Sequence, residues 1–373
     1  MKLFKSLLVA PATLGLLAPM SATANEVTIS DFAPAEELAI TNSRVDGLEA
    51  RMNNIEAGSF SETTTASFSA DMAIGAVDGG TATTDDAVEA YYGFQIDLNT
   101  SFTGEDSLDI SLDAGNAGGA VTEFDLNGTT NEALTVDGVS YTFPLGDATV
   151  FVGDNTDGSA LFSTACVYGG PSNTLDDCGN VSANFAGGGT AAGASLDFEN
   201  GFTAAVGYAG SGSSTAGLLT EEGLDSYGAN VAYTGDNYGV SLTYALVETD
   251  VAGGYEDDMF TALNAYYTPE SFPVSLSFGY EWGVDGSAAA TADETSSYFI
   301  GVQFDEVGPG TLGTAFGTKT PTVEETEDLL MYEVFYSYPI NDGMTITPLA
   351  YIKEFSGTTD DETGVMVKTS FSF

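Results

Sequence analysis

Carboxylates are the commonest chemically active side chains in this sequence, and several recur with a spacing of two or four residues. Asp109 and Asp113 stand four residues apart in Leu108-Asp-Ile-Ser-Leu-Asp-Ala114, and Asp97 has the same phase in the preceding apolar run. The chain holds 55 acidic residues, seven basic residues and no histidine. Ser-His and Cys-His catalysis and histidine-ligated metals are therefore excluded. The remaining role for these carboxylates is electrostatic, because they attract cations, repel anions and cannot neutralise nucleic-acid phosphates.

The candidate residues share one property: each lies on the polar side of a segment in which apolar and polar residues alternate. The set is Asp71, Asp97, Asp109, Asp113, Asp197, Glu281, Asp305, Glu333 and the basic Lys368. A wall lined mainly by one sign of charge concentrates counter-ions and excludes co-ions. We therefore expect these residues to line a water-filled channel that favours cations.

Alternation with a period of two runs from about residue 60 to the end of the chain. Side chains of a β-strand point to opposite faces in turn, so each segment has one apolar face and one polar face. Short turns such as Pro144-Leu-Gly-Asp147 and Asn341-Asp-Gly343 alternate with longer loops rich in Gly, Asp and Glu. We predict about sixteen strands, and an even count with turns at one end and loops at the other is typical of an outer-membrane barrel. A β-sandwich or a β-solenoid is the alternative all-β fold.

The last strand carries the alternation to the carboxyl terminus. Val365, Val367, Thr369, Phe371 and Phe373 form its apolar face, and Met366 and Lys368 begin its polar face. A free apolar edge promotes aggregation, so this strand is expected to pair with the first and close a barrel. The terminal Phe resembles the assembly signal of bacterial outer-membrane barrels. That resemblance implies the barrel-assembly machinery and outer-membrane lipid as partners.

The amino-terminal part divides into two segments before the barrel domain, 59–373. Residues 1–24 are predicted to be a secretory signal peptide, with Lys2 and Lys5 before a short apolar stretch and a small-residue cleavage site at Ala22-Thr23-Ala24. Residues 25–58 are predicted to form a periplasmic spacer and a coiled-coil helix that holds a homotrimer. Its heptad seam consists of Leu38, Val45, Leu48, Met52 and Ile55, with Thr41 in phase. An amphipathic helix packed on its own domain fits the same pattern.

Cys166 and Cys178 are the two cysteines of the chain, and both lie in its longest loop, about 154–188. An exported chain meets an oxidising compartment, so the pair is predicted to form a disulfide. The ring would stabilise the fold by about 3 kcal/mol in the chain-entropy model. We expect the loop to fold back as a constriction of the channel. A cross-linked loop that faces outward is the alternative.

The inward positions of the predicted strands hold Ser, Thr, Gly, Asn, Gln and Asp, with almost no bulk to fill a core. A sixteen-stranded barrel then leaves an aqueous channel. We predict passive diffusion of small hydrophilic solutes and inorganic ions, with no catalysis, metal or cofactor. A structural or adhesive barrel whose acidic loops bind cations is the other candidate function.

Several segments resemble a known family. They are Met1-Lys-Leu-Phe-Lys5, Leu7 to Ala12, the helix ending at Ile55, Ser101 to Asp106, Leu108 to Asn116, Tyr141 to Asp147 and Val152-Gly153. Together they are similar to the cyanobacterial outer-membrane porins, which are related to the carbohydrate-selective porins. The resemblance implies a trimeric diffusion porin of a cyanobacterial outer membrane. Two features depart from the family pattern: there is no room for a surface-layer-homology module before the helix, and the third strand, often basic in the family, is acidic here.

Overall fold

The computed structural model describes residues 63–80, 87–124, 126, 131–185, 189–212, 217–251, 254–285, 293–323, 326–357 and 359–373. The chain divides into two units, Met1–Glu56 and Ala57–Phe373, and the described residues all belong to the second. The signal peptide and the heptad seam lie outside them and stay predictions. Within the described part, no helix is both long and apolar enough to cross a membrane.

Strands make up most of the second unit. They are β1 (Thr64–Asp78), β2 (Glu89–Thr100), β3 (Ser107–Gly115), β4 (Thr135–Leu145), β5 (Ala148–Asp154), β6 (Thr190–Asp197), β7 (Phe202–Gly210), β8 (Ser226–Thr234), β9 (Tyr238–Val251), β10 (Gly254–Tyr267), β11 (Val274–Asp285), β12 (Asp293–Val307), β13 (Gly310–Thr318), β14 (Thr322–Val323), β15 (Leu330–Asn341), β16 (Met344–Lys353) and β17 (Glu362–Ser372). Two short 3-10 helices, η2 (Gly119–Val121) and η3 (Glu221–Gly223), lie in the loops.

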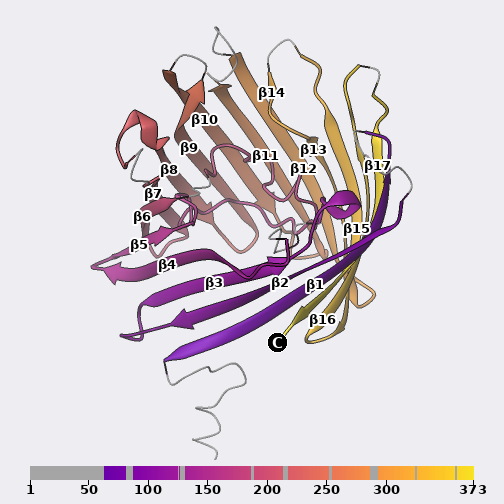
Figure 1. The fold of residues 1–373 in the computed structure, drawn as a ribbon, viewed down its shortest axis with the longest axis horizontal. Helices are drawn as coiled ribbons and strands as arrows, with labels where there is room; N and C mark the ends of the chain where they lie inside the picture. Colours follow the sequence, from indigo (N-terminus) through magenta and orange to yellow (C-terminus); the bar gives the residue numbers. More distant parts are fainter. Residues whose placement is uncertain are drawn as a thin grey trace, which may run out of the picture. The chain divides into compact units, whose positions relative to one another are not determined.

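These strands form a single antiparallel sheet that closes on itself (Figure 1). Each strand pairs with its sequence neighbour, except that β13 pairs directly with β15. The two-residue β14 pairs with β12 through Thr322 and Ser296 and so continues the line of β13. The barrel wall therefore has sixteen strands, which confirms the predicted sixteen-stranded antiparallel barrel.

The barrel closes between β1 and β17, as expected for an alternating last strand. Their register runs from Ser69 opposite Ser372 to Asp78 opposite Thr363. Beyond it, the amide of Phe68 donates to the carbonyl of Phe373 at 2.9 Å, and the amide of Phe373 donates back at 3.0 Å. The two rings stack with centroids 5.8 Å apart. Pairing thus continues to the last residue of the chain and leaves no free edge there.

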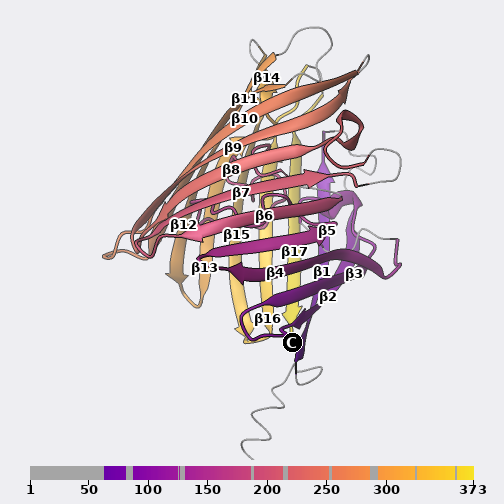
Figure 2. The same cartoon turned by 90° about the vertical axis from the view of Figure 1, so that its left-hand side faces the viewer.

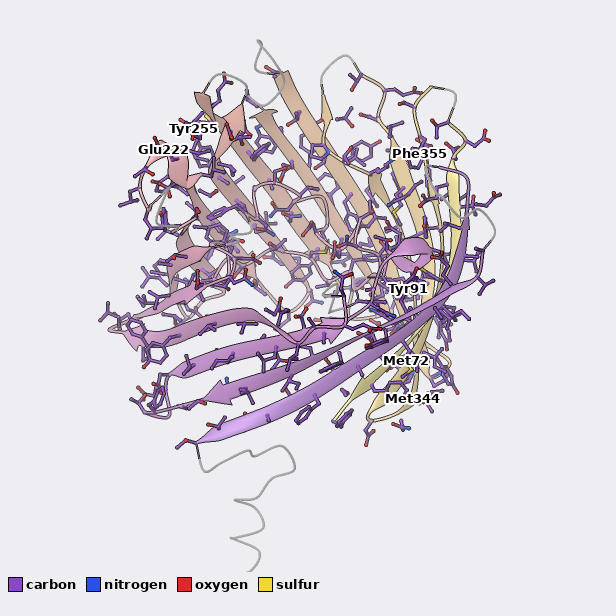
Figure 3. All side chains as sticks on the ribbon, in the orientation of Figure 1. Met72, Tyr91, Glu222, Tyr255, Met344 and Phe355 are labelled. Carbon is purple, nitrogen blue, oxygen red and sulfur yellow. A yellow bond between two sulfur atoms is a disulfide. The ribbon has the colours of Figure 1, made fainter. Side chains whose placement is uncertain are left out.

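The outer face of the wall is apolar. On β11, Leu276, Phe278, Tyr280 and Trp282 are about two-fifths exposed, whereas Ser277 and Glu281 between them are buried. Side chains stand on both sides of the ribbon in Figure 3, where Met72 of β1 is on the outer face and Tyr91 of β2 is on the inner one. Aromatic side chains gather near the two ends of the strands, with Tyr233 and Tyr238 at the short turns and Tyr280 and Trp282 toward the long loops. A wall of this kind is suited to a lipid environment.

The expectation of an inner face without bulk is wrong for part of the wall. Large apolar side chains point inward from β12, β15, β16 and β17 and are buried: Phe299, Met331, Phe335, Leu349, Tyr351 and Met366. A second cluster contains Phe151 and Phe260 from the wall, with Phe162 and Phe185 from the β5–β6 loop. The physical reason is that loops fold into the barrel and cover the inner faces of these strands, which are thereby shielded from water.

The wall differs in height around the barrel (Figure 2). Strands β9 to β12 contain 14, 14, 12 and 15 residues. Strands β5, β6 and β7 contain only 7, 8 and 9. The short strands β5 to β7, here called the low wall, include the two strands that the β5–β6 loop connects. This loop crosses the interior toward the long strands β9 to β12.

Candidate functional site

The inward loop, residues 155–185 between β5 and β6, lies inside the barrel and is held by side chains of the opposite wall. Its backbone amides at Ala165, Val167 and Tyr168 donate to Ser241 of β9 and Ser277 of β11, at 2.9 to 3.1 Å. Buried backbone groups need partners, and the wall side chains supply them. Small polar residues on these strands are therefore anchors for the loop.

Two wall carboxylates act in the same way. Glu281 of β11 accepts from the amides of Ser182 and Ala183, both at 2.8 Å, and is 1% exposed. Glu333 of β15 accepts from the Tyr168 hydroxyl at 2.6 Å and is 3% exposed. Burial and the nearby Glu333 carboxylate raise the pKa of Tyr168, so this phenol stays protonated and remains a donor.

Inward glycines on the wall make room for the loop backbone. A side chain at Gly279 would collide with the carbonyl oxygen of Cys178, and one at Gly207 with that of Gly158. At Gly301 an added Cβ would come within 2.7 Å of the Tyr168 ring. Such close approach between backbones requires a residue without a Cβ. The loop therefore fits this wall along a defined path.

Cys166 and Cys178 form the predicted disulfide, and it lies within the inward loop. Cys178 is buried, and its carbonyl accepts from Asn264 of β10 at 2.9 Å. The next residue, Gly179, accepts from the hydroxyl of Ser297 of β12 at 3.2 Å. The ring closed by the disulfide is thus also bonded directly to the wall.

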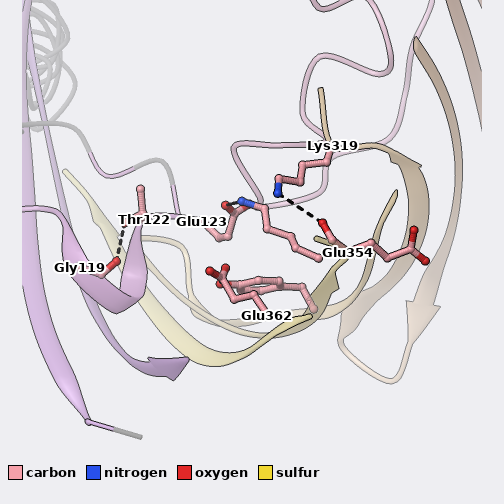
Figure 4. Close-up of polar contacts among 8 residues, drawn as sticks. Gly119, Thr122, Glu123, Lys319, Glu354 and Glu362 are labelled. Carbon is pink, nitrogen blue, oxygen red and sulfur yellow. Dashed lines mark hydrogen bonds and ion pairs between the residues drawn. The ribbon is translucent and has the colours of Figure 1, made fainter. Parts of the chain in front are cut away.

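A second segment, 116–124 with Leu126, also turns inward between β3 and β4. The amide of Ala120 donates to Glu89 of β2 at 2.7 Å, and Glu123 pairs with Lys353 of β16. Phe124 forms a β-bridge with Ser172, so the two inward segments touch. Figure 4 shows the Glu123 pair and, in the same region, Lys319, which donates to the carbonyl of Glu354 at 3.3 Å. Burial lowers the pKa of Lys319.

The inner face of β1 to β3 carries a column of carboxylates, here called the acidic ladder: Asp71, Asp113, Asp97 and Asp109. Measured along β2, these four lie level with Gly93, Gln95, Asp97 and Asn99 in turn. Successive levels are two residues apart, or about 7 Å along the strand. Asp97 accepts from Gln95 and Ser111 at 2.6 and 2.7 Å. Asp109 accepts from Asn99 and Ser107 at 2.6 and 2.8 Å.

A recess of about 320 Å³ separates the Asp109 end of the acidic ladder from the first residues of the inward loop, 155–157. Asp109, Asp137 and Asp157 line it, together with Ser111, Ser140, Asn155 and Thr156. Carboxylates therefore flank the space between wall and loop on both sides. Sequence reasoning missed Asp137 and Asp157, because Asp137 is the extra residue of a bulge that breaks the alternation and Asp157 belongs to no strand.

The predicted site residues fall into four places. Asp71, Asp97, Asp109 and Asp113 share the ladder, while Glu281 and Glu333 are buried under the inward loop. Asp197 and Asp305 are exposed near the short turns. Lys368 lies inside with its ammonium 5.3 Å from the Phe124 ring centroid, a cation–π contact. Among the described residues, no group of three or more His, Cys, Asp and Glu side chains could hold a metal ion.

Comparisons with known proteins agree with this architecture. No family model matches the chain. An uncharacterized protein of Nostoc sp., alr4550, is 26% identical and aligns with 88% of this chain and 69% of its own length. Among solved structures, OprB of Pseudomonas putida has a TM-score of 0.65 at 10% identity, covering 88% of this chain and 97% of that one. An anion-selective porin from Comamonas acidovorans has a TM-score of 0.60 at 15% identity, covering 83% and 100%. The fold is thus that of sixteen-stranded bacterial porins.

Proposed function

We propose that this chain forms a porin-type channel in the outer membrane of a Gram-negative, cyanobacterial cell, where it lets small hydrophilic solutes and inorganic ions diffuse passively. The observation that carries the proposal is the combination of an apolar outer wall with an inner wall whose open part is polar and charged. The inward loop narrows the interior from one side, as a constriction does. The chain has no histidine to serve as a general base, and we propose no catalysis.

The acidic ladder supports a preference for cations. Its four carboxylates follow the axis of the strands, and Asp137 and Asp157 add charge at the recess. The basic residues of the described chain are Lys319, Lys353 and Lys368, and they lie on or next to β13, β16 and β17. Lys353 is neutralised by Glu123. Lys368 lies opposite Ala73 of β1, two residues from Asp71, so one positive charge stands against the four carboxylates of the ladder. The net charge of this part of the wall is therefore negative, which lowers the energy of a passing cation.

A closed structural or adhesive barrel is the second candidate, and the two inward segments favour it. They bury apolar clusters on both sides of the interior and touch at Phe124 and Ser172. If they block the interior completely, no ion passes, and the function would then be cation binding by the acidic surface loops.

The proposed assembly is a homotrimer, with lipid around the outer wall and a coiled coil of the 38–55 seam in the periplasm. The heptad spacing of the seam supports this arrangement, and the exposed Phe373 is available to the assembly machinery.

Single-channel recording in a planar bilayer decides between the two functions. We expect stepwise ohmic conductance in KCl and a reversal potential under a KCl gradient that indicates cation preference. Absence of conductance from protein that is folded and inserted would refute the channel and support the closed barrel. A chloride-selective conductance would keep the channel but refute the cation preference.

A further inference from the structure

A hollow of about 540 Å³ lies on the outer face of β9 to β12 near their long-loop ends. Tyr244, Tyr280 and Trp282 line it and point outward, since their neighbours Thr243 and Glu281 are buried inside. The volume falls in the range of small-molecule sites, about 300–1,000 Å³. The hollow lies outside the barrel and is separate from the channel.

The floor of the hollow is polar although it belongs to the apolar wall. Register places Tyr244, Thr261, Trp282, Ser296 and Thr322 opposite one another across successive strands. Hydroxyls that face lipid without a partner are costly. This row therefore fits a ligand that brings hydroxyl groups of its own.

Aromatic rings form a flat platform beside this floor. Tyr280 and Trp282 stack with centroids 5.8 Å apart and an interplanar angle of 26°. They are 39% and 42% exposed, so one side of the stack is open. The negative face of an aromatic ring attracts the partly positive C–H bonds on the face of a sugar ring. Platform and hydroxyl row together have the chemistry of a carbohydrate site.

Charge at the rim limits the ligand further. Glu294 and Asp328 line the hollow, and no Lys or Arg is among its described lining residues. Carboxylates accept strongly from sugar hydroxyls and repel phosphate. Toward the middle of the wall, Leu242, Leu263 and Phe278 are exposed and continue the surface that acyl chains would cover. We propose that the hollow binds the uncharged glycosyl headgroup of a membrane lipid.

The chain provides its own probe, because Trp282 is its single tryptophan. The protein would be purified in an amine-oxide detergent without sugar and placed in phosphatidylcholine nanodiscs with rising fractions of monoglycosyl diacylglycerol. We expect a saturable change in Trp282 emission, and no such change with phosphatidylglycerol. Asp328→Asn and Thr261→Val should each raise the half-saturating fraction roughly tenfold, the value of one good hydrogen bond to a charged or buried partner.

Phe272→Leu, in the exposed short turn before β11 and so at the opposite end of that strand from the hollow, is the matched control and should leave the titration unchanged. An equal response to phosphatidylglycerol, or no response to the glycolipid, would overturn the proposal. An equal response to free methyl glycoside at the same concentration would show that the hollow binds a free sugar as well as a lipid headgroup, and would overturn the assignment to a membrane lipid. The inference requires that the barrel lies in a membrane but does not require conduction, so a glycolipid-binding barrel that fails to conduct would refute only the channel.

Discussion

The inner faces of β9–β12 and of β1–β3 carry similar polar residues, but the two regions use them differently. Under the inward loop, Ser277, Glu281 and Asn264 bond to backbone groups of the loop. On β2 and β3, Asp97 and Asp109 bond instead to neighbouring side chains of the wall. The difference teaches that an inward polar residue lines water only where no other segment covers it. Alternation identifies the inner face, and the loops decide which part of it becomes channel.

The largest effect is expected from Gly279→Ala, which tests whether the inward loop covers the inner face of β9–β12. The added methyl would collide with the carbonyl of Cys178, which is held by the disulfide and by Asn264. Overpacking of this kind costs about 1–3 kcal/mol, which shifts a docked–undocked equilibrium by roughly 5- to 150-fold. We expect a marked rise in single-channel conductance and faster proteolysis within the loop.

Gly169→Ala is the matched control for that experiment. Gly169 lies in the inward loop itself, and the nearest neighbour of an added methyl there would be the Gln303 side chain at an ordinary 3.7 Å. Conductance that stays at the wild-type value in Gly279→Ala would show that the loop does not narrow the path.

The next largest effect concerns the open region. Asp109→Asn with Asp113→Asn removes two of the ladder charges without changing their size, so the K⁺/Cl⁻ permeability ratio should fall toward one. The shift should be measured at 0.1 M salt, because at 1 M the Debye length is only about 3 Å. Asp197→Asn, exposed near a short turn, is the control and should keep the wild-type ratio. An unchanged ratio in the double variant would assign the selectivity to the loop.

A smaller effect is expected from Cys166→Ser with Cys178→Ser. The bonds from Ser277, Glu281 and Asn264 do not depend on the disulfide, so the loop should stay docked and the mean conductance should be retained. The free energy of unfolding should drop by up to about 3 kcal/mol, the loop-closure value. Thermal unfolding and channel noise measure the two effects. A large conductance change would show that the cross-link itself holds the loop.

The smallest expected effect is a pH dependence at the turn after β2. Asp106 accepts from the Tyr141 hydroxyl at 2.7 Å and from the amide and hydroxyl of Thr103, and these bonds hold its pKa well below the usual value. A lowered pKa stabilises the folded state above the unfolded value of about 3.9, and this is lost as pH falls below it. Asp106→Asn should lower the unfolding temperature at pH 7, and the gap should shrink toward pH 3. A constant gap would contradict this assignment.

Much of the fold could be predicted from alternation, because a closed wall with a lipid face and an inner face imposes a strict period of two. The ladder followed from the same rule, since Asp109 and Asp113 keep phase with Asp97. The path of the inward loop could not be predicted, because irregular backbone has no period. One signal was present: Phe299-Ile300 and Val334-Phe335 place apolar residues on both faces of a strand. That pattern indicates cover on both sides, which a water-lined wall does not have.

The unequal strand lengths have a consequence for the surrounding bilayer. Strands of seven and eight residues in β5 and β6 fall short of the roughly 9–11 that a tilted strand needs to cross hydrocarbon. In the outer membrane proposed above, lipid beside this low wall must thin, at a cost of a fraction of a kcal/mol per Å of mismatch. When two barrels contact each other through their short strands β5 and β6, the thinned lipid beside both is displaced. Hydrophobic mismatch would then draw barrels side to side before any specific contact forms between them.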